Sequence, residues 1–278
     1  MKNRTRLLPD PGYDNIQFDI LYIKIGLRLD TYIRMKIPIY VIGNKYNEPE
    51  RVAYLDKYFA TAELEVTYFQ PSYVNNLIKA ELDKFTEITH GRLFRASEKS
   101  LFLNFFYLFK VIASRADEHV LIFESDVIFD GDLKTYLEGL EVFIRSVAPD
   151  AVSIGSGCDL IHDDVNTDDN NFQIYEKDLV RCTDSYLFSK TGINKILDYM
   201  KTYGKFDEPI DNFLEKFIKE GEFSHYWVWP SITLQGSQNG YYKSSIQNNE
   251  LTQPQAPEKL LKNSLQMVAC ESLHTEHS

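Results

Sequence analysis

IPIYVIGNKYNEPERVAYLDKYFATAELEVTYFQ, residues 37–70, decides the fold of this chain. It opens with a β-branched apolar run over 37–43 that ends at a glycine, which indicates a buried strand and then a turn. Residues 47–60 carry apolar side chains at helical spacing, and Pro49 stands near the start, where a helix tolerates proline. A second strand pattern follows over 64–70. Strand, helix and strand in this order predict a βαβ unit, and a βαβ unit implies a parallel sheet.

The rest of the chain shows further strand and helix patterns. We expect strands over 120–129, 150–156 and 182–190, helices over 97–112, 133–147, 191–204 and 209–221, and a closing core segment over 225–236. The polar stretch 162–178 has no periodicity and is expected to be a loop, while residues 18–34 permit either a strand or a helix. The prediction is one α/β domain over 35–246, with an N-terminal extension over 1–34 and a partly helical or disordered tail over 247–278.

Composition narrows the class of protein. The chain has 278 residues and 44% hydrophobic content, which suits a soluble globular protein with a sizeable core. Lys and Arg number 30 against 41 Asp and Glu, a formal charge of −11, and this acidity argues against nucleic acid as the main partner. A local pocket with a divalent cation can still bind an anionic nucleotide. The aromatic content of 14% suits either sugar stacking or an aromatic core.

Cysteine usage and hydropathy bear on the compartment. Cys158, Cys182 and Cys270 show no zinc-type spacing, and so sparse a set is expected to be ordinary thiols in a reducing environment. The sequence has neither the apolar run of a signal peptide nor an 18-residue apolar stretch. These features predict a cytoplasmic protein without a transmembrane segment.

VLIFESDVIF, residues 120–129, places two carboxylates inside an apolar strand pattern. Side chains alternate along a strand, so Glu124 and Asp126 are expected on one face and Ser125 on the other. Two carboxylates side by side are costly to bury unless a cation lies between them, and a divalent ion with oxygen ligands meets that need. Ligands of open α/β sheets gather at the carboxyl ends of strands, where this pair falls. The alternative is a strand that ends at Phe123, with both acids in solvent.

Other motifs are less specific. Asp164, Asn166 and Asp168 match the first three ligand positions of an EF-hand calcium loop, but the later glycine and glutamate of that loop are missing. No P-loop, dinucleotide-binding GxGxxG or GxSxG nucleophile elbow occurs. His225, beside Trp227, suits either a packed histidine or a ligand.

Five segments in the correct order resemble glycosyltransferase family 25, over about residues 36–246. They are IPIYVIGNKYNEPERVAYLDKYF (37–59), VLIFESDVIF (120–129), CTDSYLFSKTGINKIL (182–197), PIDNFL (209–214) and WPSITLQGSQNGYYKSSI (229–246). They look like the family's opening strand and helix, acidic Glu-Asp-Asp strand, tyrosine strand, Pro-Ile/Val-Asp motif and closing segment. The family comprises nucleotide-sugar-dependent enzymes of bacterial surface glycans, collagen modification and large DNA viruses. The resemblance implies a GT-A (Rossmann-like) α/β fold with a mixed, mostly parallel central sheet.

The chain departs from the family pattern at two places. The family often has Ser-His on the helix before the acidic strand, where this chain reads Leu103-Asn104-Phe105. The middle acid of the usual Glu-Asp-Asp is Ser125, so only the outer two acids remain. Since Ser125 is expected on the face away from the chemistry, this substitution leaves the metal-facing pair intact.

The resemblance implies a metal-dependent, inverting glycosyltransferase. It would move a sugar from a nucleotide-sugar donor, with a UDP-sugar expected, to a hydroxyl of a glycan or glycoprotein acceptor. Mn²⁺ or Mg²⁺ would neutralise the leaving diphosphate, with Asp126 as the direct ligand, Glu124 on the metal shell or the ribose, and His225 as a further candidate ligand. The candidate donor-binding residues are Val41, Gly43, Asn44, Arg51, Glu124 and Ser125, with Arg92, Arg95 or Lys99 supplying extra positive charge.

An inverting reaction requires a general base that deprotonates the acceptor hydroxyl. Asp211 of PIDNFL is the candidate base, and Asp184 is held in reserve. Asp211 also suits a helix N-cap, and the two roles are compatible. Three bulky side chains are candidates for either the walls of the sugar sites or the core: Tyr186, His225 and Trp227.

Two other classes of function stay open. One is a non-catalytic GT-A-like module that binds a nucleotide or sugar, which Ser125 and the missing Ser-His favour. The other is a nucleotidyltransferase, which also uses a metal and an acid pair but expects a glycine-rich basic loop, of which GNKYNEPER (43–51) is a poor version. A viral member of the family would work in the host cytoplasm.

Overall fold

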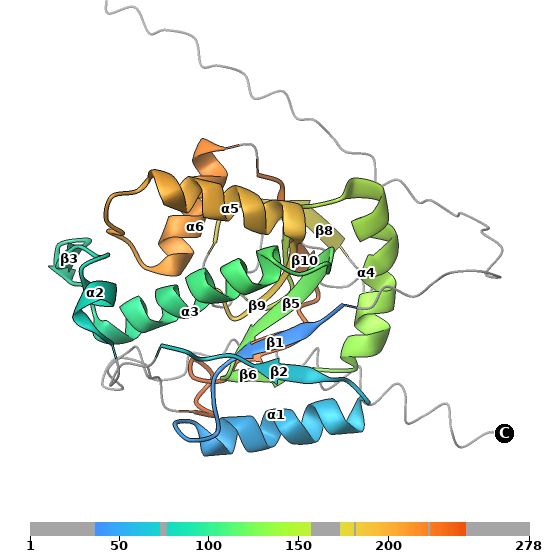
Figure 1. The fold of residues 1–278 in the computed structure, drawn as a ribbon. Coiled ribbons are helices and arrows are strands. Elements are labelled where there is room, and N and C mark those ends of the chain that lie inside the picture. Colours follow the sequence, from blue (N-terminus) through green and yellow to red (C-terminus); the bar gives the residue numbers. More distant parts are fainter. Residues whose placement is uncertain (1–36, 73–76, 157–172, 181, 222, 243–278) are drawn as a thin grey trace, which may run out of the picture. The chain divides into compact units, whose positions relative to one another are not determined.

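The computed structural model describes residues 37–72, 77–156, 173–180, 182–221 and 223–242 (Figure 1). The extension predicted over 1–34, the tail over 247–278 and the EF-hand-like residues of 164–168 lie outside the described residues.

The central sheet has seven strands in the order β2-β1-β5-β9-β7-β10-β8. Their bounds are Ile39–Ile42 (β1), Val66–Tyr68 (β2), His119–Glu124 (β5), Ala151–Ser153 (β7), Gln173–Glu176 (β8), Ser185–Ser189 (β9) and His225–Trp229 (β10). β1 pairs in parallel with β2 and β5, and β10 pairs in parallel with β7. β9 is antiparallel to both of its neighbours, and β8 is antiparallel to β10. The predicted α/β fold with a mixed, mostly parallel central sheet is confirmed.

Six helices occur among the described residues (Figure 1). They are α1 Pro49–Thr61, α2 Lys79–Leu82, α3 Ala96–Ala113, α4 Leu133–Val147, α5 Lys190–Thr202 and α6 Ile210–Glu220. The five longer helices coincide with the predicted ones to within a few residues. Sequence periodicity does not predict α2 or the hairpin of β3 (Ile88–Thr89) and β4 (Arg92–Leu93), because each is too short to show a repeat.

The two faces of the sheet bury alternate side chains of β5. Val120 and Ile122 join the larger hydrophobic core with Phe102 and other residues of α3, α5 and α6. Phe123 points to the other face, where its ring centroid lies 6.3 Å from that of Phe59 in α1. Side chains therefore alternate between the two faces of the sheet along β5, as the period-two pattern of the sequence predicts.

The sequence pattern suggested a single strand over 120–129, but the structure has two strands there. β5 ends at Glu124, the chain turns at Ser125 and Asp126, and β6 (Val127–Phe129) pairs with β11 (Thr233–Gln235) in a separate two-stranded sheet. Ser125 N still donates to Ile42 O of β1 at 3.1 Å, whereas Gly236 N donates to Asp126 O at 2.6 Å. The turn therefore connects a strand of the central sheet to a strand of the two-stranded sheet. The partner of β6 in that second sheet is β11, from the C-terminal segment.

The expected loop over 162–178 contains a strand at its end. β8 pairs antiparallel with β10, with Trp229 opposite Gln173. Its neighbours in the sequence are polar, so only the pairing with β10 identifies it as a strand. The preceding residues, 157–172, lie outside the described residues.

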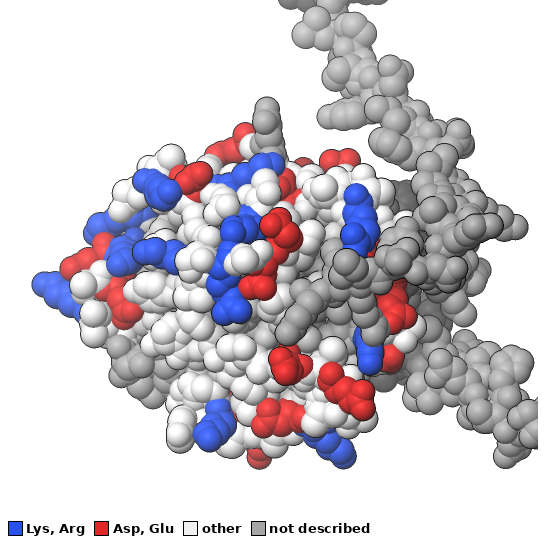
Figure 2. All heavy atoms as spheres, turned by 45° about the vertical axis from the view of Figure 1, so that its right-hand side comes forward, with Lys and Arg blue, Asp and Glu red and all other residues white. Residues whose placement is uncertain are grey.

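On the face drawn in Figure 2, Lys and Arg side chains are interspersed with Asp and Glu side chains. The described part of this face therefore carries no continuous basic surface of the kind that phosphate backbones require. In the described part of the chain, every helix is too short or too polar to cross a lipid bilayer.

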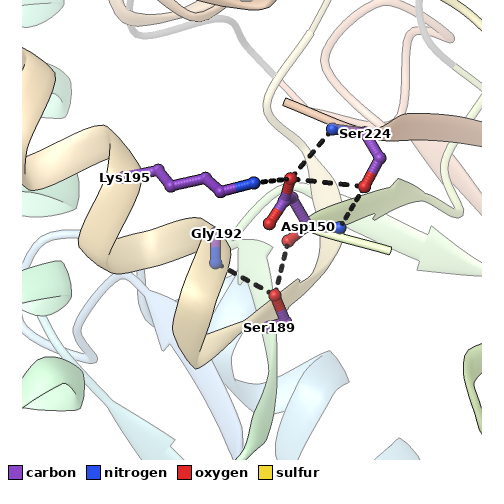
Figure 3. Close-up of polar contacts among 5 residues, drawn as sticks. All are labelled: Asp150, Ser189, Gly192, Lys195 and Ser224. Atoms are coloured by element: carbon purple, nitrogen blue, oxygen red, sulfur yellow. Dashed lines mark hydrogen bonds and ion pairs between the residues drawn. The ribbon is translucent and has the colours of Figure 1, made fainter. Parts of the chain in front are cut away.

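An ion pair between the buried Asp150 and the partly exposed Lys195 joins α5 to the sheet at the edge where β7 and β10 begin (Figure 3). Asp150 Oδ2 accepts from Lys195 Nζ at 2.7 Å and from Ser224 N at 2.9 Å. Ser189 Oγ donates to the Asp150 carbonyl at 3.3 Å and accepts from Gly192 N at 3.0 Å, so it also caps α5. These contacts join the start of α5 and the end of β9 to the starts of β7 and β10.

Candidate active site

Four carboxylates gather at the edge of the sheet where β1 and β5 end. They are Glu124 at the end of β5, Asp126 in the following turn, Asp184 before β9 and Asp211 in the first turn of α6. Burial raises the pKa of Glu124 well above its ordinary value, and the charges of the other three acids, that of Asp126 most, raise it further. The acids repel one another in a dehydrated site, so an added cation would stabilise them.

Asp126 has an unusual environment for a carboxylate. Its side chain is 5% exposed, and its Oδ1 has no hydrogen-bond partner among the described residues. A buried carboxylate oxygen without a donor is costly, and hard divalent cations prefer such oxygen ligands. This orphaned oxygen therefore fits a divalent cation of the Mg²⁺ or Mn²⁺ type.

Asp184 is enclosed by the protein. It is 1% exposed, and Ser185 Oγ donates to its Oδ2 at 3.1 Å. Burial, followed by the charge of Asp126, raises its pKa to about 7. A β-carbon at Gly155 would lie only 2.2 Å from Asp184 Oδ2, so the backbone of Gly155 closes the remaining side. Asp184 therefore has little surface with which to meet an acceptor hydroxyl.

Asp211 is more accessible than Asp184. It is half-buried, and its Oδ1 accepts from Asn212 N at 3.0 Å. Burial raises its pKa above the ordinary value. The predicted N-cap role is wrong: Pro209 occupies the N-cap position of α6, so Asp211 lies inside the first turn. The Asp211 carboxylate therefore does not cap the helix, and its half-buried side chain remains accessible to a ligand.

Arg51 forms the basic corner of the site. Its Nη1 donates to Glu48 Oε1 at 2.8 Å and to Ser125 Oγ at 3.2 Å, and its guanidinium lies 5.4 Å from the centre of the Tyr242 ring. Burial raises the pKa of Glu48, while the charge of Arg51 lowers it. Ser125 lies in the turn after β5 and contacts α1 through Arg51, so strand alternation does not determine its direction. The expectation that Ser125 faces away from the chemistry stays a prediction, and it depends on the role of Arg51, the hydrogen-bond partner of Ser125.

The end of β1 brings three other predicted residues to this corner. Gly43 is required by close packing, since a β-carbon there would lie 2.5 Å from Ser125 Cβ. Asn44 Nδ2 donates to Gln70 Oε1 at the end of β2. Val41 has no exposed surface, so its side chain belongs to the core rather than to a ligand site.

The three extra cations of the prediction lie near the start of α3. Arg92 forms two hydrogen bonds with Glu98, at 2.6 and 2.8 Å, and the charge of Asp211 contributes to its raised pKa. Lys99 Nζ lies 5.4 Å from the centre of the Phe94 ring. Arg95 is the N-cap residue of α3. These side chains therefore lie around the N-terminus of α3. Of the three, Arg92 is close enough to Asp211 to feel its charge.

His225 is not brought to the acids. It is 1% exposed, its Nδ1 lies 2.7 Å from Lys177 O, and its ring stacks on Tyr186 at 5.8 Å. Burial lowers its pKa to about 4, so the ring is neutral. Trp227 is also buried, and its Nε1 donates to Leu179 O. All three candidate sugar-wall residues therefore have core positions.

No three His, Cys, Asp or Glu side chains in the described ranges are arranged as a closed metal site. Mg²⁺ and Mn²⁺ sites commonly use one or two carboxylates and take their other ligands from phosphate and water. Glu124 and Asp126 would supply the one or two carboxylates of such a site.

Sequence reasoning missed several residues of the site. Thr183 Oγ1 donates to Glu124 Oε1 at 2.8 Å, Glu48 holds Arg51, and Tyr242 covers the guanidinium. These residue types are common on protein surfaces, and only the tertiary contacts distinguish them. Pro49 after Glu48 gives the helix start but not the direction of the Glu48 side chain.

Cys182, two residues before Asp184, corrects another prediction. It forms a disulfide, so the expectation of an ordinary thiol is wrong at this position. Its Sγ lies 3.3 Å from Gln235 Oε1 at the end of β11. The other two cysteines, Cys158 and Cys270, lie outside the described residues. Spacing along the sequence does not reveal such a bond, because its ends meet only in the fold.

The comparison with protein families agrees with the resemblance. A family model described as "Glycosyltransferase family 25 (LPS biosynthesis protein)" matches residues 36–214. Among solved structures, the glycosyltransferase GlyE of Streptococcus pneumoniae TIGR4 is similar, with 13% identity and a TM-score of 0.43 over 84% of this chain. The match spans 61% of that structure's chain, less than two thirds of its length. A search of curated proteins found no match.

Proposed function

Because the chain belongs to glycosyltransferase family 25, we propose that it transfers a sugar from a UDP-sugar to a hydroxyl of a glycan or glycoprotein acceptor. The observation that carries this proposal is the gathering of Glu124, Asp126 and Asp211 at the sheet edge that also holds Arg51. Family membership supports glycosyl transfer in general. The donor nucleotide, the cation and the inversion of configuration are parts of the proposal.

Asp126 would hold a divalent cation, Mn²⁺ or Mg²⁺, with Glu124 in the cation's outer shell or on the donor ribose. The unpartnered Oδ1 of Asp126 and the raised pKa of Glu124 support this assignment. When bound, the cation would act as a Lewis acid that neutralises the diphosphate leaving group.

Arg51 would bind the donor diphosphate from the opposite side. Glu48 and Ser125 hold its guanidinium in place. A guanidinium that is already oriented loses little entropy when it binds a diphosphate. Glu48 also offsets the charge of Arg51, so the corner has little net positive charge of its own. The diphosphate would therefore depend on the added cation as well as on Arg51.

Asp211 would act as the general base. The acceptor oxygen would attack the anomeric carbon from the face opposite the diphosphate, as the bond to the diphosphate oxygen breaks. Asp211 would take the proton of the acceptor hydroxyl in the same step. Its partial exposure favours it over Asp184, which the protein encloses.

The test is a transfer assay on the full chain with UDP-, GDP- and CMP-sugars, Mn²⁺ and a panel of glycan and glycoprotein acceptors. Asp126→Ala should abolish transfer, while Asp198→Ala, whose side chain is 72% exposed, should leave it unchanged. Undiminished transfer in the presence of chelator would contradict the role of the cation. NMR of the newly formed linkage would report inversion or retention.

The same experiment separates the two alternative functions. A nucleotide that binds without turnover would indicate the non-catalytic module that Ser125, in place of an acid, favours. Pyrophosphate release from a nucleoside triphosphate would indicate a nucleotidyltransferase.

A further inference from the structure

The side-chain amide of Asn44 has a fixed orientation. Its Oδ1 accepts from the backbone N–H groups of Tyr46, at 3.0 Å, and Asn47, at 3.1 Å. A backbone N–H can only donate, so the atom that faces these two groups must be the oxygen. The Nδ2 of Asn44 must therefore point to its other neighbour, Gln70.

This orientation also determines that of Gln70. Asn44 Nδ2 donates to Gln70 Oε1, and Asn47 Nδ2 lies 3.4 Å from the same oxygen. Two donors converge on the oxygen, so Gln70 Nε2 points away from them with two N–H groups. Gln70 Nε2 has no hydrogen-bond partner among the described residues, and Gln70 itself is partly exposed.

The backbone that carries Gln70 is held firmly. Ser72, two residues later, is 2% exposed, and its N donates to Asn104 Oδ1 at 3.0 Å. Its carbonyl accepts from Asn104 Nδ2 at 2.8 Å and from Ser100 Oγ at 2.9 Å. Asn104 therefore anchors the end of β2 from α3, at the position where this chain departs from the family's Ser-His.

Asn44 and Gln70 each lie two residues beyond the end of a strand, Asn44 after β1 and Gln70 after β2, and Asn44 directly follows Gly43. β1 and β2 are in register from Ile39 and Val66, so their carboxyl ends meet at the same sheet edge. A nucleotide with its diphosphate at Arg51 would have its base within reach of this edge.

We propose that Gln70 selects the base of the donor nucleotide, by donating from Nε2 to the carbonyl oxygen O4 of uracil or O6 of guanine. The ligand class is a nucleoside diphosphate of uracil or guanine. This inference rests on the proposed function, and it assigns the choice of base to a residue that the family motifs do not include. Cytosine and adenine present an amino group at the corresponding position, and two donors that face each other leave both unpaired.

The test is the ratio of dissociation constants of UDP, GDP, CDP and ADP, measured by calorimetry on the full chain with Mn²⁺. The wild-type chain should bind UDP or GDP about tenfold more tightly than CDP or ADP. Gln70→Glu keeps an acceptor for Asn44 and turns the outward donor into an acceptor, so the preference should vanish or reverse. Gln70→Met removes the donor without adding charge, so the ratio should fall towards one.

Tyr46→Asp is the matched control, because it adds a negative charge to the same turn at a side chain that is 85% exposed, and it keeps the contacts of Asn44 and Asn47 with Gln70. It should weaken all four nucleotides alike and keep their ratio. Unchanged base preference in both Gln70 variants would overturn the inference, and sugar transfer by those variants would leave the proposed function standing. If no nucleoside diphosphate binds the wild-type chain, the proposed function fails, and the inference fails with it.

Discussion

Gly155 and Asp184 lie so close together that a β-carbon at position 155 would come within 2.2 Å of the Asp184 carboxylate. One residue belongs to the segment after β7 and the other to the segment before β9. The backbone of Gly155 therefore shapes the pocket in which Asp184 is enclosed, and the absence of a side chain at this position is a structural requirement of the site.

Gly155→Ala should destabilise the protein by about 1–3 kcal/mol, because the added methyl group overpacks a rigid buried contact. Thermal or urea unfolding measures the change. Gly204→Ala is the matched control: a β-carbon there meets nothing within 4 Å, so its effect should stay within about 0.5 kcal/mol. Equal effects of the two substitutions would contradict the packing described here.

The stability of the cation-free protein should fall as the pH rises from 4 towards 7. The pKa of Asp184 is 3.8 for a free carboxyl and about 7 in the fold. In this window the folded chain binds more protons than the unfolded chain, so deprotonation favours unfolding by up to about 1.4 kcal/mol for each pH unit. Unfolding in urea at several pH values, with chelator present, measures the slope.

Asp184→Asn should flatten this pH dependence, since the amide is neutral throughout the range. Serving as the control, Asp198→Asn removes an exposed carboxylate and should leave the slope unaltered. A slope that is the same in all three proteins would show that Asp184 does not titrate in this window.

Glu48→Gln should strengthen the binding of UDP in the absence of a divalent cation, by roughly fivefold. The amide oxygen can still accept from Arg51, but the negative charge that offsets the guanidinium is gone. Calorimetry with chelator measures the affinity. Glu50→Gln, on the exposed side of the same helix turn, is the control and should have little effect. Weaker UDP binding by Glu48→Gln would indicate that its charge is needed to position Arg51.

Asp211→Asn should lower kcat by about 10²–10⁴-fold and leave donor affinity nearly unchanged, because the amide cannot accept the acceptor's proton. Steady-state kinetics and UDP calorimetry measure the two effects separately. In the wild-type enzyme, the acid limb of the kcat/KM profile should lie above the ordinary carboxyl range, since burial raises the pKa of Asp211. Asn212→Ala, next to it and exposed, should leave both kinetic parameters intact. Loss of donor binding in Asp211→Asn would contradict the role of base.

Local patterns were sufficient for most elements of the fold. β1, α1 and β2 follow the βαβ prediction because the sequence patterns over 37–43, 47–60 and 64–70 are each long enough to recognise, and the partner strands are neighbours in the sequence. The same reasoning failed over 120–129, where half of the apolar run pairs with β1 and the other half with β11. A periodic pattern records which side chains are buried, but not which strand buries them.

Glu124, Asp126, Asp184 and Asp211 were all identifiable as candidates from motif order. Their different characters were not. Asp184 is enclosed, Asp211 is partly exposed and lies inside α6, and Asp126 keeps an oxygen without a partner. These differences depend on neighbours such as Gly155 and Pro209, which a carboxylate's own sequence context does not reveal.

The sequence by itself determined the α/β class, the family and the presence of an acidic pair at the end of a central strand. It did so because periodicity and motif order are properties of short segments. Only the tertiary structure decided that Ser125 meets Arg51, that His225 belongs to the core, and that Gln70 directs its N–H groups outward. Each of these depends on hydrogen bonds or packing between residues from distant segments, whose free energy is gained only when the whole domain has folded.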